Sequence, residues 1–191
     1  SDPNVMLTGS YWGIHRTDDA GAPEVVWTSL NNGYRTTQCY TVIIDKNAAN
    51  DPTIVTGLQD NGNFFGNSDD PAATWTQTVN GDGSYGAIGP DRSFYILSIQ
   101  QGRVAKVAID DAGNVTAFRR IDPIGPKKDD YLFINPLATD PNDPEVLYLP
   151  AQRRLYRQNA LGSIPLTGEW DSIAQGWMAF PDTLVASAGG N

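Results

Sequence analysis

Short apolar segments separated by turns run along the whole chain. They are rich in β-branched and aromatic residues, which predicts β-strands, and no stretch keeps the helical spacing of apolar positions over three turns. Glycine and proline, 19 and 13 of the 191 residues, are spread between the segments. This punctuation is typical of many short strands, so we predict an all-β protein. The predicted strands include residues 5–7, 11–16, 39–45, 54–57, 63–65, 94–98, 103–107, 131–134, 146–149 and 154–157.

The predicted strands fall into four repeats. Each repeat opens with a proline-containing turn, near residues 2, 51, 90 and 140, and the prolines of these turns lie 49, 38 and 51 residues apart. Four short strands in a step of roughly 40–50 residues are typical of one β-propeller blade. We therefore predict a single β-propeller region over residues 1–191, with about four blades of four strands each.

The repeats are out of phase with the two ends of the sequence. The first repeat begins inside a blade, and residues 183–187 read as one more strand that would open a further blade. We expect the chain to be a piece of a larger ring. The alternative is a small closed ring in which the two terminal strands complete one blade.

An acidic turn followed by an aromatic residue recurs in the repeats. The best copy is Ser68-Asp69-Asp70-Pro71-Ala72-Ala73-Thr74-Trp75, and partial copies begin at Thr17 and Asp110. The best copy resembles the Asp-box of neuraminidase-type repeats, Ser/Thr-x-Asp-x-Gly-x-Thr-Trp, with Ala72 in place of glycine. An aspartate at this position accepts hydrogen bonds from amides of its own turn, and the tryptophan packs a large apolar face between strands. We interpret the motif as a device that stabilises a blade.

Two other segments extend the resemblance. Val55 to Gly62 contains Gln-Asp-Asn-Gly, and Asn80 to Gly83 contains Gly-Asp-Gly. Both look like segments of sortilin-type and xyloglucanase-type propellers, which are found in secreted bacterial proteins. The resemblance implies a propeller located outside the cell or on the cell surface.

Charge and cysteine content restrict the classes of partner and site. The formal net charge is −9, which argues against nucleic acid and against an anionic membrane surface. No apolar run of 18 residues predicts membrane insertion. The cations come at most in pairs, which we interpret as solvated strand ends. Cys39, the single cysteine, excludes an intramolecular disulfide and is predicted to be a buried strand residue. The cation pairs are Arg119-Arg120, Lys127-Lys128 and Arg153-Arg154.

Two aspartates in glycine- and asparagine-rich turns are the main candidates for chemistry. Asp60 and Asp82 are an alternative choice for the paired carboxylates of a glycosidase. They are also weak candidates for a hard-cation site, because oxygen-rich loops suit Ca²⁺, although neither spacing matches an EF-hand. Ordinary turn chemistry accounts for both residues more simply. We therefore predict no catalytic residue, no metal ligand and no required cofactor.

Binding is the simpler role for these loops. We predict Asp60, Asn61, Asp82 and Trp12 as ligand-binding residues, with Trp12 available for stacking on a sugar ring. The leading prediction is a non-catalytic interaction or adhesion module that presents loops to a protein or glycan partner, or to the remaining blades of a larger propeller. The alternative is part of a glycoside hydrolase resembling xyloglucanase-type enzymes, whose site would need residues from further blades.

Overall fold

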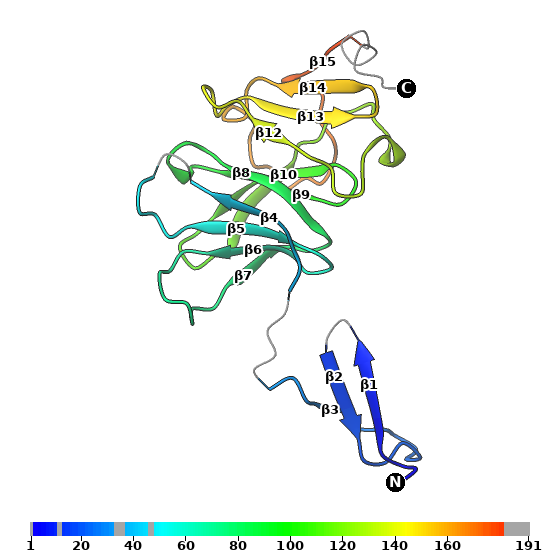
Figure 1. Cartoon of the computed structure of the whole chain (residues 1–191). Helices are drawn as coiled ribbons and strands as arrows, with labels where there is room; N and C mark the ends of the chain where they lie inside the picture. The colour runs from blue at the N-terminus through cyan, green and yellow to red at the C-terminus, as the bar shows by residue number, and fades with distance from the viewer. Residues whose placement is uncertain (1, 11–12, 33–36, 46–47, 182–191) are drawn as a thin grey trace, which may run out of the picture. The chain divides into compact units, whose positions relative to one another are not determined.

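The computed structural model describes residues 2–10, 13–32, 37–45 and 48–181, and it divides the chain into two compact units, Ser1–Thr37 and Gln38–Asn191 (Figure 1). Trp12 and the predicted strand at 183–187 lie outside the described residues. Among the described residues, strands and two short 3₁₀ helices are the regular elements, and none of the helices is long and apolar enough to cross a membrane.

The fold is all-β, as the sequence predicts. Every described sheet is an antiparallel meander in which strands follow one another in sequence order. The second unit contains three sheets of four strands each. The first sheet is β4 (Cys39–Ile44), β5 (Ile54–Leu58), β6 (Gly62–Gly66) and β7 (Thr76–Val79); the second is β8 (Gly83–Ile88), β9 (Tyr95–Ile99), β10 (Arg103–Ile109) and β11 (Val115–Arg120); the third is β12 (Ala138–Thr139), β13 (Leu147–Ala151), β14 (Arg154–Gln158) and β15 (Trp177–Ala179).

The three sheets of the second unit pack like successive propeller blades. β8, the first strand of its sheet, contacts β4, β5 and β6 of the preceding sheet and β12 of the following one. The first strands of neighbouring sheets therefore lie together, as they do around the centre of a propeller. The two 3₁₀ helices, Pro90–Arg92 (η1) and Lys128–Asp130 (η2), lie in connections between strands.

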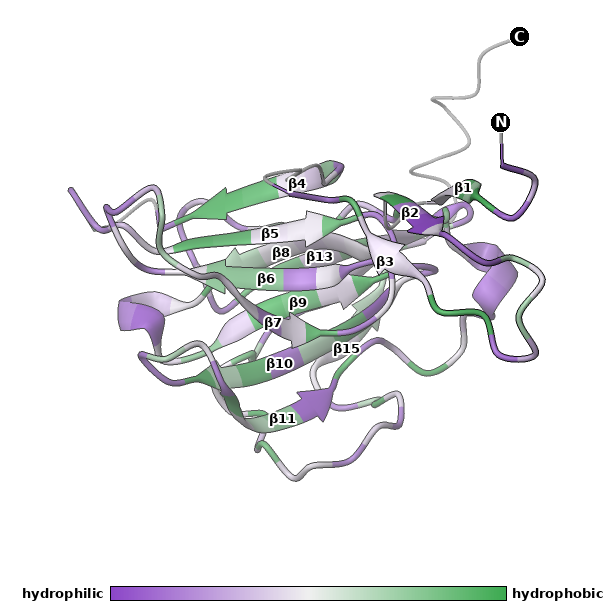
Figure 2. Cartoon of the chain, turned by 90° about the horizontal axis from the view of Figure 1, so that it is seen from below, coloured by the Kyte–Doolittle hydropathy of each residue, from purple (hydrophilic) through white to green (hydrophobic). Residues whose placement is uncertain are grey.

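β9 shows why these sheets stack. All five of its residues are buried, because both faces of the strand are covered. Tyr95 and Leu97 join Val55 and Phe65 in one cluster, where the rings of Phe65 and Tyr95 meet edge to face with centroids 5.9 Å apart. Ile96 points the other way into a second cluster, which contains Val104 of the same sheet and Leu147 and Leu149 of the third sheet. Figure 2 shows the apolar residues of this unit mainly in its strands.

The first unit is a smaller, three-stranded sheet with little core of its own. Its strands are β1 (Met6–Ser10), β2 (Gly13–Thr17) and β3 (Thr28–Ser29). Within the unit's described residues only Gly13 and Thr17 are buried, whereas Leu7 and Val26 are 63% and 74% exposed. Its strands correspond to the second, third and fourth strands of the other sheets, because a hairpin joins β1 to β2 and an acidic turn joins β2 to β3.

The repeat markers of the sequence do not coincide with blade boundaries. The proline turns near residues 51, 90 and 140 lie between the first and second strands of each sheet of the second unit, so each sheet begins one strand before its marker. The predicted strand at 131–134 is wrong: these residues follow η2 as an irregular loop, and Leu132 and Phe133 are exposed. Cys39 is also exposed, not buried as predicted, because no described element covers its side chain.

The acidic turns recur at one structural position, between the third and fourth strands of a blade. In the best copy, the amide of Asp70 donates to Ser68 Oγ (3.1 Å) and the amide of Ala72 donates to Asp70 Oδ1 (2.8 Å). The same two bonds occur in the first unit, where Asp19 N donates to Thr17 Oγ1 and Gly21 N to Asp19 Oδ1. In the third copy Asp110 Oδ1 accepts from Ala112 N, but Ala108 replaces the hydroxyl residue.

The third sheet of the second unit, β12–β15, has a turn at the same place but no aspartate in it. Gln158, fully buried at the end of β14, accepts from the amides of Asn159 and Ala160 through Oε1. Its amide group donates to the carbonyl of Gln175 (2.8 Å). A longer side chain on the strand therefore satisfies the turn amides that an aspartate satisfies in the other copies.

Candidate functional site

One end of the second unit carries the hairpins that join second and third strands, together with the connections from one sheet to the next. Backbone hydrogen bonds tie each hairpin to a connection: Gly62 N donates to Gly81 O (2.6 Å), Gln100 N to Asp82 O (3.0 Å) and Gln152 N to Asp130 O (2.7 Å). We call this end the hairpin face. The acidic turns lie at the opposite strand ends, because they join the third strand to the fourth.

Asp60 and Asp82, the two candidate aspartates of the sequence, come together on the hairpin face. Asp60 has a left-handed backbone (φ 58°), and its amide donates to Asp82 Oδ1 at 2.9 Å. Asn61 lies beside them and donates from its side chain to Gln59 O (2.9 Å). The Asp82 carboxylate therefore holds the β5–β6 hairpin, while Asp60 is exposed.

Asp82 also links two blades through its backbone. Its amide donates to Gln100 Oε1 (2.9 Å), and its carbonyl accepts from Gln100 N on the β9–β10 hairpin. Among the described residues, no group of three or more His, Cys, Asp or Glu side chains could hold a metal ion. The donors around Asp82 are amides, so the observed chemistry of this aspartate is that of a turn.

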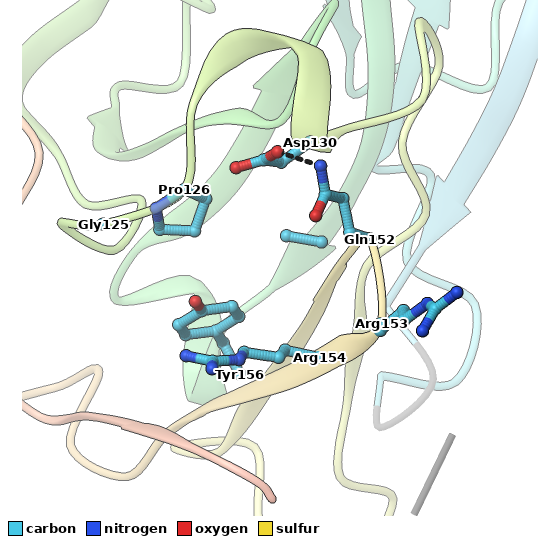
Figure 3. Close-up of a pocket in the computed structure, with 8 residues that line it drawn as sticks. Gly125, Pro126, Asp130, Gln152, Arg153, Arg154 and Tyr156 are labelled. Carbon is cyan, nitrogen blue, oxygen red and sulfur yellow. Dashed lines mark hydrogen bonds between the residues drawn. The ribbon is translucent and has the colours of Figure 1, made fainter. Parts of the chain in front are cut away.

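A cavity of 340 Å³ opens on the hairpin face of the third sheet. Its walls come from the connection between the second and third sheets and from the β13–β14 hairpin (Figure 3). Tyr156 and Arg154 both line the cavity from β14, and in the figure Arg153 extends outward from the rim. The lining residues are Gly125, Pro126, Asp130, Ala151, Gln152, Arg153, Arg154 and Tyr156.

Asp130 fixes the position of both walls. Its carboxylate accepts from the amide of Lys127 (2.7 Å), the residue that precedes η2, and from the side-chain amide of Gln152 in the hairpin. The amide of Gln152, a residue with φ 50°, donates to Asp130 O. One carboxylate thereby joins the connection to the hairpin, so the cavity has a defined shape.

Tyr131 follows Asp130 in the sequence and packs against the apolar core. Burial raises the pKa of its phenol well above the ordinary range, and nearby Asp122 and Tyr156 raise it further. Its hydroxyl is buried with no hydrogen-bond partner among the described residues. The ring lies against Gly102 (φ 70°), where an added Cβ would be 2.3 Å from Tyr131 Cδ1. Glycine at this turn is thus needed both for its backbone angle and for the close approach of the ring.

The arginine pairs of the sequence have different roles in the structure. Arg120 forms two hydrogen bonds, of 2.7 and 2.9 Å, with the buried Asp122, and Arg119 lies 2.8 Å from Glu169. The interpretation of this pair as a solvated strand end is therefore wrong. Arg153 and Arg154 are exposed but line the cavity.

Sequence reasoning missed the cavity. The available signal was the second cation pair, Lys127-Lys128, one residue after Pro126 in a connection of an otherwise acidic chain. Only the fold brings that connection to the β13–β14 hairpin, since about 25 residues separate them in sequence. Trp12, the remaining predicted binding residue, lies outside the described residues.

Comparisons with known proteins give no family. No family model matches the sequence, and no curated protein matches it. Among solved structures, a protein of unknown function from Bacteroides caccae is similar, with a TM-score of 0.41 and 13% sequence identity. The match covers 84% of this chain and 56% of that protein, so the chain spans about half of its length. At this level the likeness says nothing about activity.

Proposed function

We propose that this chain is a non-catalytic interaction module of a secreted or cell-surface protein, and that the hairpin face of the second unit holds a protein or glycan partner. The observation that carries the proposal is the cavity on that face, because it offers arginine, glutamine and tyrosine side chains on a hairpin fixed by Asp130. Loops fixed on a rigid β scaffold are suited to recognition.

The propeller family is part of the same proposal. The matching hydrogen bonds of the turns at Asp19, Asp70 and Asp110 support an Asp-box repeat. A further partner in the proposal is a neighbouring blade of a larger ring. Val42 and Ile44, 64% and 59% exposed on β4, would suit such a blade because an apolar strand face is stabilised by burial.

Binding arrays test the proposal directly. The full chain would be applied to a glycan array and to an array of synthetic peptides, with saturable binding to one of the two classes as the expected result. Binding should weaken in the hairpin-face variant Arg154→Gln and persist in Arg92→Gln, which makes the same charge change in η1, at the other end of the strands. No binding to either class, or equal loss in both variants, would contradict the proposal.

A glycoside hydrolase remains the alternative, and the specific observation in its favour is that Asp60 and Asp82 lie together. The observation against it is that Asp82 Oδ1 already accepts the Asp60 amide. Because the alternative needs residues from further blades, the deciding measurement is of new reducing ends after xyloglucan is incubated with a protein that contains those blades as well. We expect no cleavage; cleavage that Asp82→Asn abolishes in a correctly folded protein would replace the binding proposal with an enzymatic one.

A further inference from the structure

The surroundings of the cavity differ in charge from the rest of the chain. The segments 127–130 and 153–154, which line or adjoin the cavity, carry four cations, Lys127, Lys128, Arg153 and Arg154, against the two carboxylates of Asp129 and Asp130, so their summed charge is +2. The whole chain has a net charge of −9. Asp130 is already engaged by Lys127 N and by the Gln152 side chain. An anionic group is therefore attracted to this place and repelled by most of the remaining surface.

Large apolar side chains are exposed on the connection that forms one wall. Ile124, Leu132 and Phe133 are all more than half exposed, and they lie on either side of the lining residues Gly125, Pro126 and Asp130. Exposed large apolar residues that flank cavity-lining residues in the sequence are typical of a binding surface.

The backbone that carries these apolar residues is well anchored. Ile124 N donates to Ile173 O (3.1 Å), Leu132 N donates to Asn135 Oδ1 (3.1 Å), and Gln101 N donates to Phe133 O (2.8 Å). Asn135 is itself buried and donates to Pro150 O on β13. The exposure is thus built into the fold, and a ligand would meet preorganised apolar groups at little entropic cost.

We propose that the cavity and this connection together bind an acidic peptide segment, with a carboxylate of the peptide at Arg154 and an adjacent apolar side chain on Leu132 and Phe133. The proposal rests on the proposed function and names the class of partner. An arginine guanidinium suits a carboxylate, and Tyr156, which also lines the cavity, has a hydroxyl that can act as a further donor.

The test uses the full chain and defined probes. A fluorescein-labelled Gly-Leu-Glu-Glu-Leu-Gly peptide would be titrated by fluorescence anisotropy, beside the same peptide with glutamine in place of both glutamates. We expect saturable binding of the acidic peptide, at least about tenfold weaker binding of the glutamine peptide, and weaker binding at high salt. Equal binding of both peptides would overturn the proposal.

Variants locate the contacts. Arg154→Gln and Arg153→Gln should each weaken the acidic peptide several-fold, and Leu132→Ser should weaken both peptides. Arg92→Gln, the matched charge control in η1, should leave the affinity unchanged. Because Arg154 also interacts within the fold, the unfolding midpoint of each variant would be measured alongside. Equal losses in Arg92→Gln and Arg154→Gln, or no loss in Leu132→Ser, would contradict the proposal.

A sugar probe separates this inference from the proposed function. A galacturonic acid tetrasaccharide carries carboxylates without apolar side chains. If it binds more tightly than the acidic peptide and Arg154→Gln weakens it, the peptide inference fails while the interaction module stands. If neither probe binds and the arrays are also negative, both fail.

Discussion

A single buried lysine shows how strongly one residue can tie two blades together. Lys106 on β10 is 5% exposed, and its Nζ donates to the carbonyl oxygens of Leu161 (2.7 Å), Gly162 (3.1 Å) and Ile164 (2.8 Å) in the next blade. It also lies 4.8 Å from the centre of the Phe94 ring. Burial lowers the pKa of this lysine, but the three carbonyls and the ring stabilise its charge.

Replacing this lysine tests its role. Lys106→Met should lower the free energy of unfolding of the second unit by about 2–4 kcal/mol, because three partly or fully buried carbonyls lose their donor. Urea unfolding followed by tryptophan fluorescence measures the change. Lys128→Met, at an exposed position, is the control and should change stability by less than about 0.5 kcal/mol. Similar midpoints for both variants would show that Lys106 contributes little.

A second residue-scale prediction concerns the acidic turn at Asp110. The side chain and the amide of Asn114, followed by the amides of Ala112 and Gly113, lower the pKa of Asp110 below its ordinary value of 3.8. A carboxylate with a lowered pKa stabilises the fold above pH 3.8, and this contribution is lost as the pH falls through the lowered value. Asn114→Ala should raise the pKa of Asp110 toward 3.8, as measured by NMR titration of its carboxyl carbon. An unchanged titration would mean that the amides of the turn alone lower the pKa.

At the scale of elements, two glycines let neighbouring blades approach closely. A Cβ on Gly57 of β5 would lie 2.2 Å from Ser84 O, and one on Gly83 of β8 would lie 2.8 Å from the Cα of Gly57. Backbone therefore meets backbone where β5 and β8 cross. Such an approach leaves no room for any side chain, which is why a glycine is required on each strand.

The contact predicts that an alanine substitution at Gly57 destabilises the protein more than one at an uncrowded glycine. Gly57→Ala should destabilise the second unit by about 1–3 kcal/mol, since backbone atoms rather than a flexible side chain would have to move. Gly9→Ala in β1 is the matched change, because a Cβ there meets nothing within 4 Å. Thermal unfolding by circular dichroism compares the two. A melting temperature for Gly57→Ala as high as that of Gly9→Ala would argue that the sheets can separate without cost.

At the scale of the whole molecule, the two units differ in the core available to them. The second unit has two clusters of buried apolar residues between its sheets. In the first unit, Leu7, Ile14 and Val26 are more than half exposed. A three-stranded sheet of this size with so little buried apolar surface is marginal by itself.

Separate expression tests this difference. Residues 38–191 should unfold cooperatively in urea, whereas a peptide of residues 1–37 should show no cooperative transition by circular dichroism. The intact chain, measured under the same conditions, is the reference. A cooperative transition of the isolated peptide would show that its sheet is stable without an apolar partner.

The sequence by itself determined the strands and the turns of this protein. Alternation of β-branched and aromatic residues with glycine and proline is a local signal, and it located β5, β6, β9, β10, β13 and β14 to within about two residues. The acidic turns are local as well, because Asp70 and Asp19 bond to amides two residues away. The strand predicted around Leu132 and Phe133 was wrong, because these two apolar side chains are exposed in a loop and do not belong to a sheet.

Only the tertiary structure decided where chemistry gathers. The Asp60–Asp82 contact, the Lys106 contacts and the cavity at Arg154 each join segments at least about 20 residues apart in sequence. Such contacts depend on how one blade packs against the next, and burial of β9 on both faces sets that packing. The periodicity of a sequence predicts which side chains of a strand face the core, but it does not predict which strand faces pack against one another.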